Sequence, residues 1–204
     1  FQVINNFMGL IIKFFVLSIF YLGLIFNVNA ANEDGSFAIK GIGSSTCSRY
    51  LDLMQAGESE AVFQFGGWMN GYISASNEFH QDTFDLVSFE EPDTLLVYVT
   101  KYCRAYPSHR FLFAVKAILK SFSDNRVKQN SKMITFPGQS KLKLYEETID
   151  WIAGELKSKG FIEDPLPSLE DIKKALVKFQ IEQGIDGKGE PTQQTLIALL
   201  RRHK

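Results

Sequence analysis

Apolar residues recur at helical spacing through most of the chain beyond residue 45. From Thr46 to Phe122, spacings of three, four and seven residues predict a small helical bundle. The small residues Gly67, Gly71 and Ser74 lie on one face of a helix in this bundle and would let a neighbouring helix approach closely. The opposite face of that helix would turn five large side chains toward the core: Phe65, Trp68, Met69, Tyr72 and Phe79.

Two more helices are predicted before residue 123, on either side of a proline. Asp93 can cap the first, and Pro107 would stop it. Ser108 stands where the second helix needs its N-cap. The inward residues of the first would be Leu95, Leu96, Val99, Tyr102 and Cys103, and those of the second Phe111, Leu112, Val115, Ile118, Leu119 and Phe122.

Residues 123–143 interrupt the helical pattern. The stretch is polar and basic and contains the pair Pro137-Gly138, and only Met133, Ile134 and Phe136 are large apolar residues within its central part. This composition predicts a linker, with room for one short extended segment.

A second helical pattern follows from residue 144. Gly160 and Gly184 would end its first two helices, Ser168 with Asp171 resembles a capping box, and Thr192 can cap the last helix. The inward residues would be Tyr145, Ile149, Ile152, Leu156, Leu169, Ile172, Leu176, Phe179, Leu196, Leu199 and Leu200. Three helices in about sixty residues would form a core that is marginal on its own.

The amino-terminal thirty residues have a different composition. Lys13 is their only charged residue, an uncharged and mostly apolar run follows it at 14–26, and Val28 and Ala30 supply small residues for cleavage. This pattern is typical of a secretory signal peptide covering 1–30, with 31–45 as an extension of the mature chain. The alternative is a retained membrane anchor, which the acidic flank at Glu33 and Asp34 disfavours.

Export would change how the two cysteines are interpreted. Cys47 and Cys103 are the only cysteines, and an oxidising compartment would join them in a disulfide. Closing that loop would stabilise the fold by about 4 kcal/mol. The alternative is a pair of buried free thiols. His80, His109 and His203 lack the spacing of zinc ligands, so no metal is expected.

Charge and residue pattern narrow the classes of function. Residues 31–125 carry a net charge of −5 and residues 126–204 a net charge of +3, which is too weakly basic to indicate nucleic-acid binding. Neither a triad nor a metal-ligand cluster is evident, so no catalytic residue and no cofactor are predicted. The adjacent Glu90 and Glu91 are expected in a solvated turn.

The region 46–122 resembles HdeA-type small helical periplasmic proteins and the related Tai-like amidase-immunity proteins. The residues that carry the resemblance are Cys47, Trp68, Gly71, Tyr72, Ala75, Asn77, Tyr102, Cys103 and Pro107. The resemblance implies a disulfide-linked helical fold that binds proteins, as an inhibitor or an acid-stress chaperone. Trp68, Tyr72 and Asn77 are the protein-interaction candidates, although an aromatic stripe such as Trp68 and Tyr72 is more often part of a core.

The region 145–201 resembles the three-helix peptidoglycan-binding domain found at the ends of many cell-wall hydrolases. The matching residues are Ala175, Leu176, Phe179, Gln180, Gly184, Ile185, Gly189, Thr195 and Leu196, with Thr192 where the family usually has an aspartate N-cap. The resemblance implies a ligand site whose candidates here are Trp151, Phe161, Phe179, Gln180, Gly189 and Thr192.

Two features qualify the second resemblance. The segment 163–172 is shorter than the family's glycine-containing loop and has Pro165, Leu166 and Leu169 where glycines are expected, beside the groove usually taken as the ligand site. Trp151 lies about 120° from the centre of its helix's apolar stripe. It could stack on a sugar or stem peptide, or seal a contact with the region 46–122.

The sequence therefore predicts a mainly α protein with five parts: a signal peptide at 1–30, an extension at 31–45, a disulfide-linked helical bundle at 46–122, a linker at 123–143 and a three-helix peptidoglycan-binding-like domain at 144–204. The expected function is that of a non-enzymatic periplasmic or secreted bacterial protein that binds peptidoglycan and presents a protein-interaction domain. The alternatives are a protein-binding inhibitor or chaperone without wall binding, and a wall hydrolase with an unrecognised active site.

Overall fold

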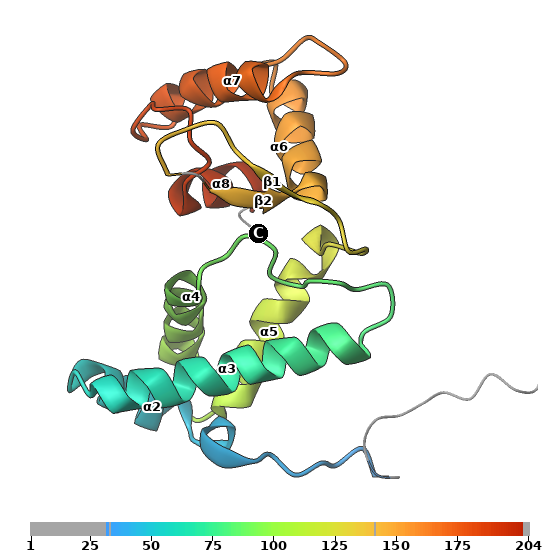
Figure 1. Ribbon diagram of the computed structural model, residues 1–204. Helices are drawn as coiled ribbons and strands as arrows, with labels where there is room; N and C mark the ends of the chain where they lie inside the picture. Colours follow the sequence, from blue (N-terminus) through green and yellow to red (C-terminus); the bar gives the residue numbers. More distant parts are fainter. Residues whose placement is uncertain (1–31, 33, 141, 202–204) are drawn as a thin grey trace, which may run out of the picture. The chain divides into compact units, whose positions relative to one another are not determined.

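The computed structural model describes residues 32, 34–140 and 142–201. The chain divides between Ala38 and Ile39 into two compact units. The first is described only at Asn32 and 34–38, where the backbone N–H of Ser36 donates to Asn32 Oδ1 at 2.6 Å. The predicted signal peptide lies outside the described residues. Those residues contain seven α-helices and a two-stranded sheet, which confirms the mainly α class (Figure 1).

Four α-helices and a short 3-10 helix form the bundle. They are η1 (Gly41–Ser44), α2 (Cys47–Gln55), α3 (Ser59–Phe79), α4 (Pro92–Ala105) and α5 (Phe111–Phe122). Thr46 caps α2, with its side chain accepting a hydrogen bond from the backbone N–H of Arg49 at 3.3 Å. Proline occupies the first turn of α4, where its missing N–H is not needed.

The bundle core centres on three aromatic rings. Tyr50, Phe65 and Phe111 meet pairwise with ring centroids 4.6–5.2 Å apart, and each side chain is at most 1% exposed. All six residues predicted to face inward on α5 are buried, as the spacing of that helix indicated: Phe111, Leu112, Val115, Ile118, Leu119 and Phe122.

The prediction for α3 is correct only in part. Its buried face is Ala61, Phe65, Met69, Ile73 and Ser76. Phe79 is 78% exposed, because the core cluster includes α3 residues only as far as Ile73. The expected close approach at Gly67 and Gly71 is also wrong, since a Cβ at either glycine would meet nothing within 4 Å.

Two predicted caps are wrong as well. The N-cap position of α4 is Glu91 rather than Asp93, and that of α5 is Arg110 rather than Ser108. The chain before α5 is held by backbone pairing instead. The N–H of Cys47 donates to the His109 carbonyl at 2.7 Å, and the N–H of Phe111 donates to the Ser45 carbonyl at 2.8 Å.

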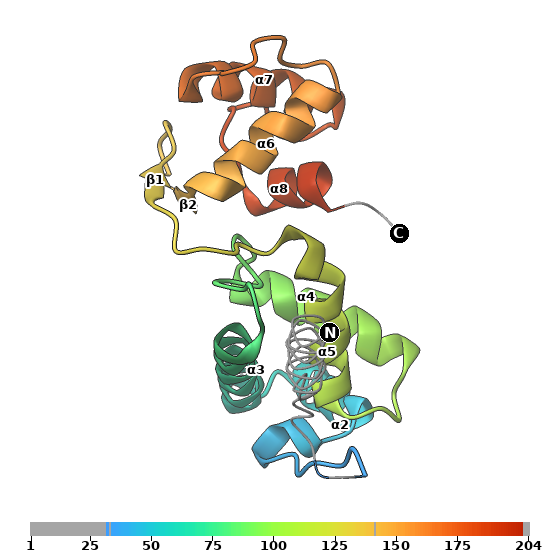
Figure 2. The ribbon, with the colours of Figure 1, turned by 90° about the vertical axis from the view of Figure 1, so that its right-hand side faces the viewer.

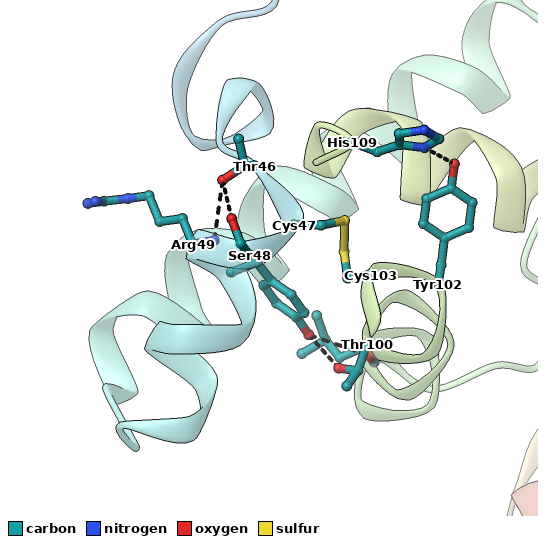
Figure 3. Close-up of a disulfide and its surroundings, with 10 residues drawn as sticks. Thr46, Cys47, Ser48, Arg49, Thr100, Tyr102, Cys103 and His109 are labelled. Carbon is teal, nitrogen blue, oxygen red and sulfur yellow. Dashed lines mark hydrogen bonds between the residues drawn. A yellow bond between two sulfur atoms is a disulfide. The ribbon is translucent and has the colours of Figure 1, made fainter. Parts of the chain in front are cut away.

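Cys47 and Cys103 form the predicted disulfide, which joins the start of α2 to the end of α4 (Figure 3). Both cysteines are fully buried. Hydrogen bonds between side chains flank the bridge. The Tyr50 hydroxyl lies 2.9 Å from Thr100 Oγ1, and the Tyr102 hydroxyl lies 2.8 Å from His109 Nδ1. The disulfide therefore fixes a contact between α2 and α4 that hydrogen bonds also support.

The segment 80–91 between α3 and α4 is anchored on both sides. Asn77 Oδ1 accepts a hydrogen bond from the backbone N–H of Leu86 at 3.0 Å, and Asp85 forms an isolated β-bridge with Val127. Leu86, Phe89 and Glu90 are buried. The expectation of a solvated Glu90 is therefore wrong, because this segment lies within the fold.

The stretch predicted as a linker contains ordered elements. A short helix η2 (Ser123–Asn125) precedes two strands, β1 (Met133–Thr135) and β2 (Lys143–Tyr145). The strands pair antiparallel, with Ile134 opposite Leu144. The predicted extended segment is β1, whereas the second strand was not expected. Val127, Phe136 and Leu144 are buried, so this stretch contributes to the core.

Three helices follow the hairpin: α6 (Glu146–Ser158), α7 (Leu169–Glu182) and α8 (Gln193–Leu200). Figures 1 and 2 show them gathered together, with the hairpin at the start of α6. Ser168 and Asp171 form the expected capping box, and hydrogen bonds from Ser168 lower the pKa of Asp171. Gly160 and Gly184 end their helices with positive φ, as predicted for helix C-termini.

The second core cluster lies among α6, α7, α8 and the hairpin. Its members include Ile149, Ile152 and Leu156 from α6, which confirms the stripe predicted for that helix except at the half-buried Tyr145. The cluster also includes Phe89 from the segment 80–91. The segment 80–91 therefore contributes to both cores, with Leu86 in the first and Phe89 in the second.

Polar contacts join the same loop to α8. The backbone N–H of Glu91 donates to Gln193 Oε1 at 3.1 Å, and Gln193 Nε2 donates to the Phe89 carbonyl. The Arg201 guanidinium pairs with the Glu90 carboxylate and lies 3.8 Å from the centroid of the Phe122 ring. Burial raises the pKa of Glu90, and this effect outweighs the lowering by Arg201.

Candidate functional site

Gln180 determines the shape of the turn between α7 and α8. Its Oε1 accepts a hydrogen bond from the backbone N–H of Gly189 at 2.7 Å, and its Nε2 donates to the Glu190 carbonyl at 2.7 Å and to Thr195 Oγ1 at 2.9 Å. Gln180 is fully buried. It has no surface to offer a ligand, so its observed contacts are those of a residue that positions the turn.

Gly189 has the positive φ that glycine tolerates, and a Cβ there would lie 2.7 Å from the Lys173 carbonyl oxygen. Thr192 is exposed and caps α8 by accepting a hydrogen bond from the backbone N–H of Thr195 at 3.3 Å, as predicted. Phe179 is 2% exposed. Among Phe179, Gln180, Gly189 and Thr192, Thr192 alone is exposed enough to contact a ligand.

Trp151 and Phe161 are both half-buried and pack against the second core cluster. The Phe161 ring meets that of Phe179 edge to face at 5.7 Å, which holds it in place. Each ring therefore keeps part of its surface accessible. Of the six residues predicted to bind peptidoglycan, three are buried and three keep exposed surface.

A groove lies elsewhere on the same helices. It has a volume of 420 Å³ and runs between α6 and the segment 164–169. Its floor is apolar, with Ile134, Ile149, Ala153, Leu169 and Ile172. Its polar residues are Glu146, Asp150, Lys157 and Asp164, so the groove carries three carboxylates and one ammonium group.

The outer edge of this groove is formed by Pro165, Leu166 and Pro167. Leu166 is 88% exposed, and its backbone N–H donates to Asp164 Oδ1 at 2.9 Å. An apolar side chain held in solvent by a proline-flanked turn can contact the body of a ligand in the groove. These residues were not among the predicted site residues, although the sequence had marked the segment as unusual.

The predicted interaction residues of the bundle mainly support its structure. Trp68 Nε1 donates to the Lys40 carbonyl at 2.9 Å, and its ring leaves no room for a Cβ at Gly43. Asn77 holds the segment 80–91, as described above. Tyr72 stacks on Trp68 with ring centroids 5.4 Å apart and remains half-buried.

Two cavities open on the bundle. One has a volume of 410 Å³ and lies between the end of α3 and α5, where Tyr72 contributes to its lining. The other has a volume of 570 Å³ and lies between α2 and α4. Its lining includes Met54, Leu96 and Val97, and Val97 is 66% exposed.

Within 32, 34–140 and 142–201, no group of three or more His, Cys, Asp or Glu side chains could hold a metal ion. In that same part of the chain, no helix combines the length and apolar character needed to cross a bilayer.

Comparison with known proteins gave no match to a family model, a curated protein or a solved structure. The fold and surface therefore define the class: a disulfide-linked, mainly helical protein with two connected cores and an open groove on the second.

Proposed function

We propose that this chain is a non-enzymatic, exported envelope protein that binds peptidoglycan through the groove between α6 and the segment 164–169. The observation that carries the proposal is the position of the groove. It borders the segment that, by resemblance to peptidoglycan-binding domains, flanks the ligand site. The Cys47–Cys103 disulfide supports export, because such bonds persist in oxidising compartments.

The composition of the groove suits a fragment of the wall. Peptidoglycan offers sugar rings with apolar faces, hydroxyl and amide donors, and stem peptides with both amines and carboxylates. The apolar floor and Leu166 would contact the faces of the sugars. Carboxylates of Glu146, Asp150 and Asp164 would accept from hydroxyls and amines, and Lys157 would pair with a stem carboxylate.

Gly154 offers a way to block the groove without disturbing the fold. It lies on α6 in the groove lining, and a Cβ there would meet nothing within 4 Å. Gly154→Trp should fill the groove. Gly67→Trp is the matched control, because Gly67 is also an exposed helical glycine with open space around it and lies on α3.

The test is co-sedimentation of residues 31–204 with purified sacculi. Point variants are preferable to truncations, because cutting the chain after the bundle would expose Phe89 and Glu90. The wild type and Gly67→Trp should pellet, and Gly154→Trp should remain in the supernatant. Failure of the wild type to pellet, or equal pelleting of all three proteins, would contradict the proposal.

A second candidate function is a protein-binding inhibitor or chaperone-like activity of the bundle. The specific observation is the cavity between α2 and α4, where the strongly exposed Val97 lies beside Leu96 and Met54. Asp93, Lys101 and Arg104 add charges of both signs around it. Suppression of client aggregation at low pH, lost in Val97→Asp, would support this function; equal suppression by the variant would exclude this cavity.

A further inference from the structure

The cavity between α3 and α5 is separate from the peptidoglycan groove and from the cavity beside Val97. Its volume of 410 Å³ falls within the range of roughly 300–1,000 Å³ typical of small-molecule sites. Leu86, Ala117 and Leu119 give it an apolar lining. A chain of methylene groups could therefore be buried there.

The charged groups that line this cavity are both cations. Lys116 and Lys120 line it from successive turns of α5, and the imidazole of His80 lies beside them at the C-cap of α3. Residues 31–125 contain seven Lys and Arg against twelve Asp and Glu, yet two of those cations and none of those acids line the cavity. A positive site in an acidic region would select an anion.

Hydroxyl groups complete the polar lining. Tyr72, Ser76 and Ser123 each contribute one. Burial raises the pKa of Tyr72, so its phenol stays protonated and can donate a hydrogen bond to an anion. Stacking against Trp68 fixes the direction of the Tyr72 ring. The lining thus combines hydrogen-bond donors with apolar surface.

We propose that this cavity binds a small amphiphilic anion, a carboxylate that carries one medium-length aliphatic chain. The carboxylate would pair with Lys116 and Lys120, and the chain would lie against Leu86 and Leu119. A ten-carbon fatty acid has twelve non-hydrogen atoms, which at roughly 30 Å³ each, the volume share of a liquid water, need about 360 Å³. The cavity can hold one such molecule and no second chain.

The test uses calorimetric titration of residues 31–204 with decanoate below its micelle concentration. Decyltrimethylammonium, with the same chain and the opposite charge, is the ligand control. Lys116→Gln/Lys120→Gln should weaken decanoate binding at least tenfold. Lys174→Gln/Lys178→Gln is the matched control, because it removes two exposed lysines at the same spacing on α7 and should leave the affinity unchanged.

Ala117→Phe provides a second variant that acts on volume rather than charge, and it should abolish binding while leaving both lysines in place. Saturable one-to-one binding of decanoate, with the pattern above, would support the proposal. The proposal is overturned if decanoate gives no saturable binding, if the cationic amphiphile binds equally, or if the α7 control loses as much affinity. Binding only to anionic phospholipid vesicles, with none to monomeric decanoate, would also overturn it.

Discussion

Arg201→Met tests whether the loop 80–91 and the end of α8 are joined in solution as the structure describes. The variant keeps much of the volume of the side chain and removes its charge. Glu90 is 7% exposed, and its Oε2 lacks a hydrogen-bond partner, so removing Arg201 would leave the carboxylate buried without its counter-ion.

The expected loss of unfolding free energy follows from that burial. Removing one partner of a buried ion pair costs about 3–5 kcal/mol, whereas replacing both partners by apolar residues is often neutral or stabilising. Arg201→Met should therefore lower the stability by about 3–5 kcal/mol near pH 7. The double variant Glu90→Leu/Arg201→Met should return to within about 1 kcal/mol of the wild type.

Urea unfolding followed by circular dichroism measures both quantities on residues 31–204. With the single variant Glu90→Leu measured in the same way, the difference between the double variant and the sum of the two single variants gives the coupling energy of the pair. A loss below about 1 kcal/mol in Arg201→Met would show that the pair is not buried in solution, because an exposed pair gives losses of that size. Equal destabilisation of the single and double variants would contradict a buried pair as well.

Four further outcomes follow from individual contacts. Reducing the Cys47–Cys103 bridge should lower the unfolding free energy by about 4 kcal/mol, measured by denaturation with and without reductant. Gln180→Ala should cost about 3 kcal/mol, because it leaves buried polar groups of the α7–α8 turn unpaired, and amide exchange at that turn should increase. Thr192→Ala should cost about 1 kcal/mol in the same denaturation assay through loss of the α8 cap. The folded-state pKa of Glu90 is raised, so the contribution of Glu90 to stability is greatest below its unfolded-state pKa. That contribution should fall as the pH rises through the folded-state pKa. The difference in melting temperature between the wild type and Glu90→Gln, measured against pH, should show this fall.

The sequence predicted the helices well wherever an apolar stripe and a terminal signal agreed. Gly160, Gly184 and the Ser168–Asp171 pair act as the local rules require, because caps depend on residues close in the chain. The disulfide was also predictable, since only two cysteines are present. Neighbouring residues were enough to predict these helix ends, and the number of cysteines was enough to predict the disulfide.

Long-range contacts were not predictable in the same way. From the sequence alone Glu90 resembles a surface residue, because its partner Arg201 lies more than one hundred residues further along the chain. The hairpin strands are three residues each, too short for a recognisable alternation. The residues at 107–111 pair with the start of α2 instead of using a side-chain cap at Ser108, and no local pattern encodes that pairing.

In the candidate site too, local features were predictable from the sequence and long-range ones were not. Gln180 and Gly189 matched a spacing that identifies the fold of the turn, and the structure buries both because the spacing reflects packing. The groove depends on how α6 meets the segment 164–169, which the sequence indicated only as a departure at Pro165–Leu169. The spacing therefore marked residues that pack inside the turn, and not the surface that a ligand could reach.

The most direct test of the central claim is a nuclear magnetic resonance titration of ¹⁵N-labelled residues 31–204 with a soluble disaccharide-tetrapeptide from peptidoglycan. Saturable shift changes are expected only in α6 around Asp150–Lys157 and in the segment 164–169, and they should be lost in Gly154→Trp. Shift changes centred on the exposed surface around Thr192, or none at all at millimolar ligand, would contradict that claim.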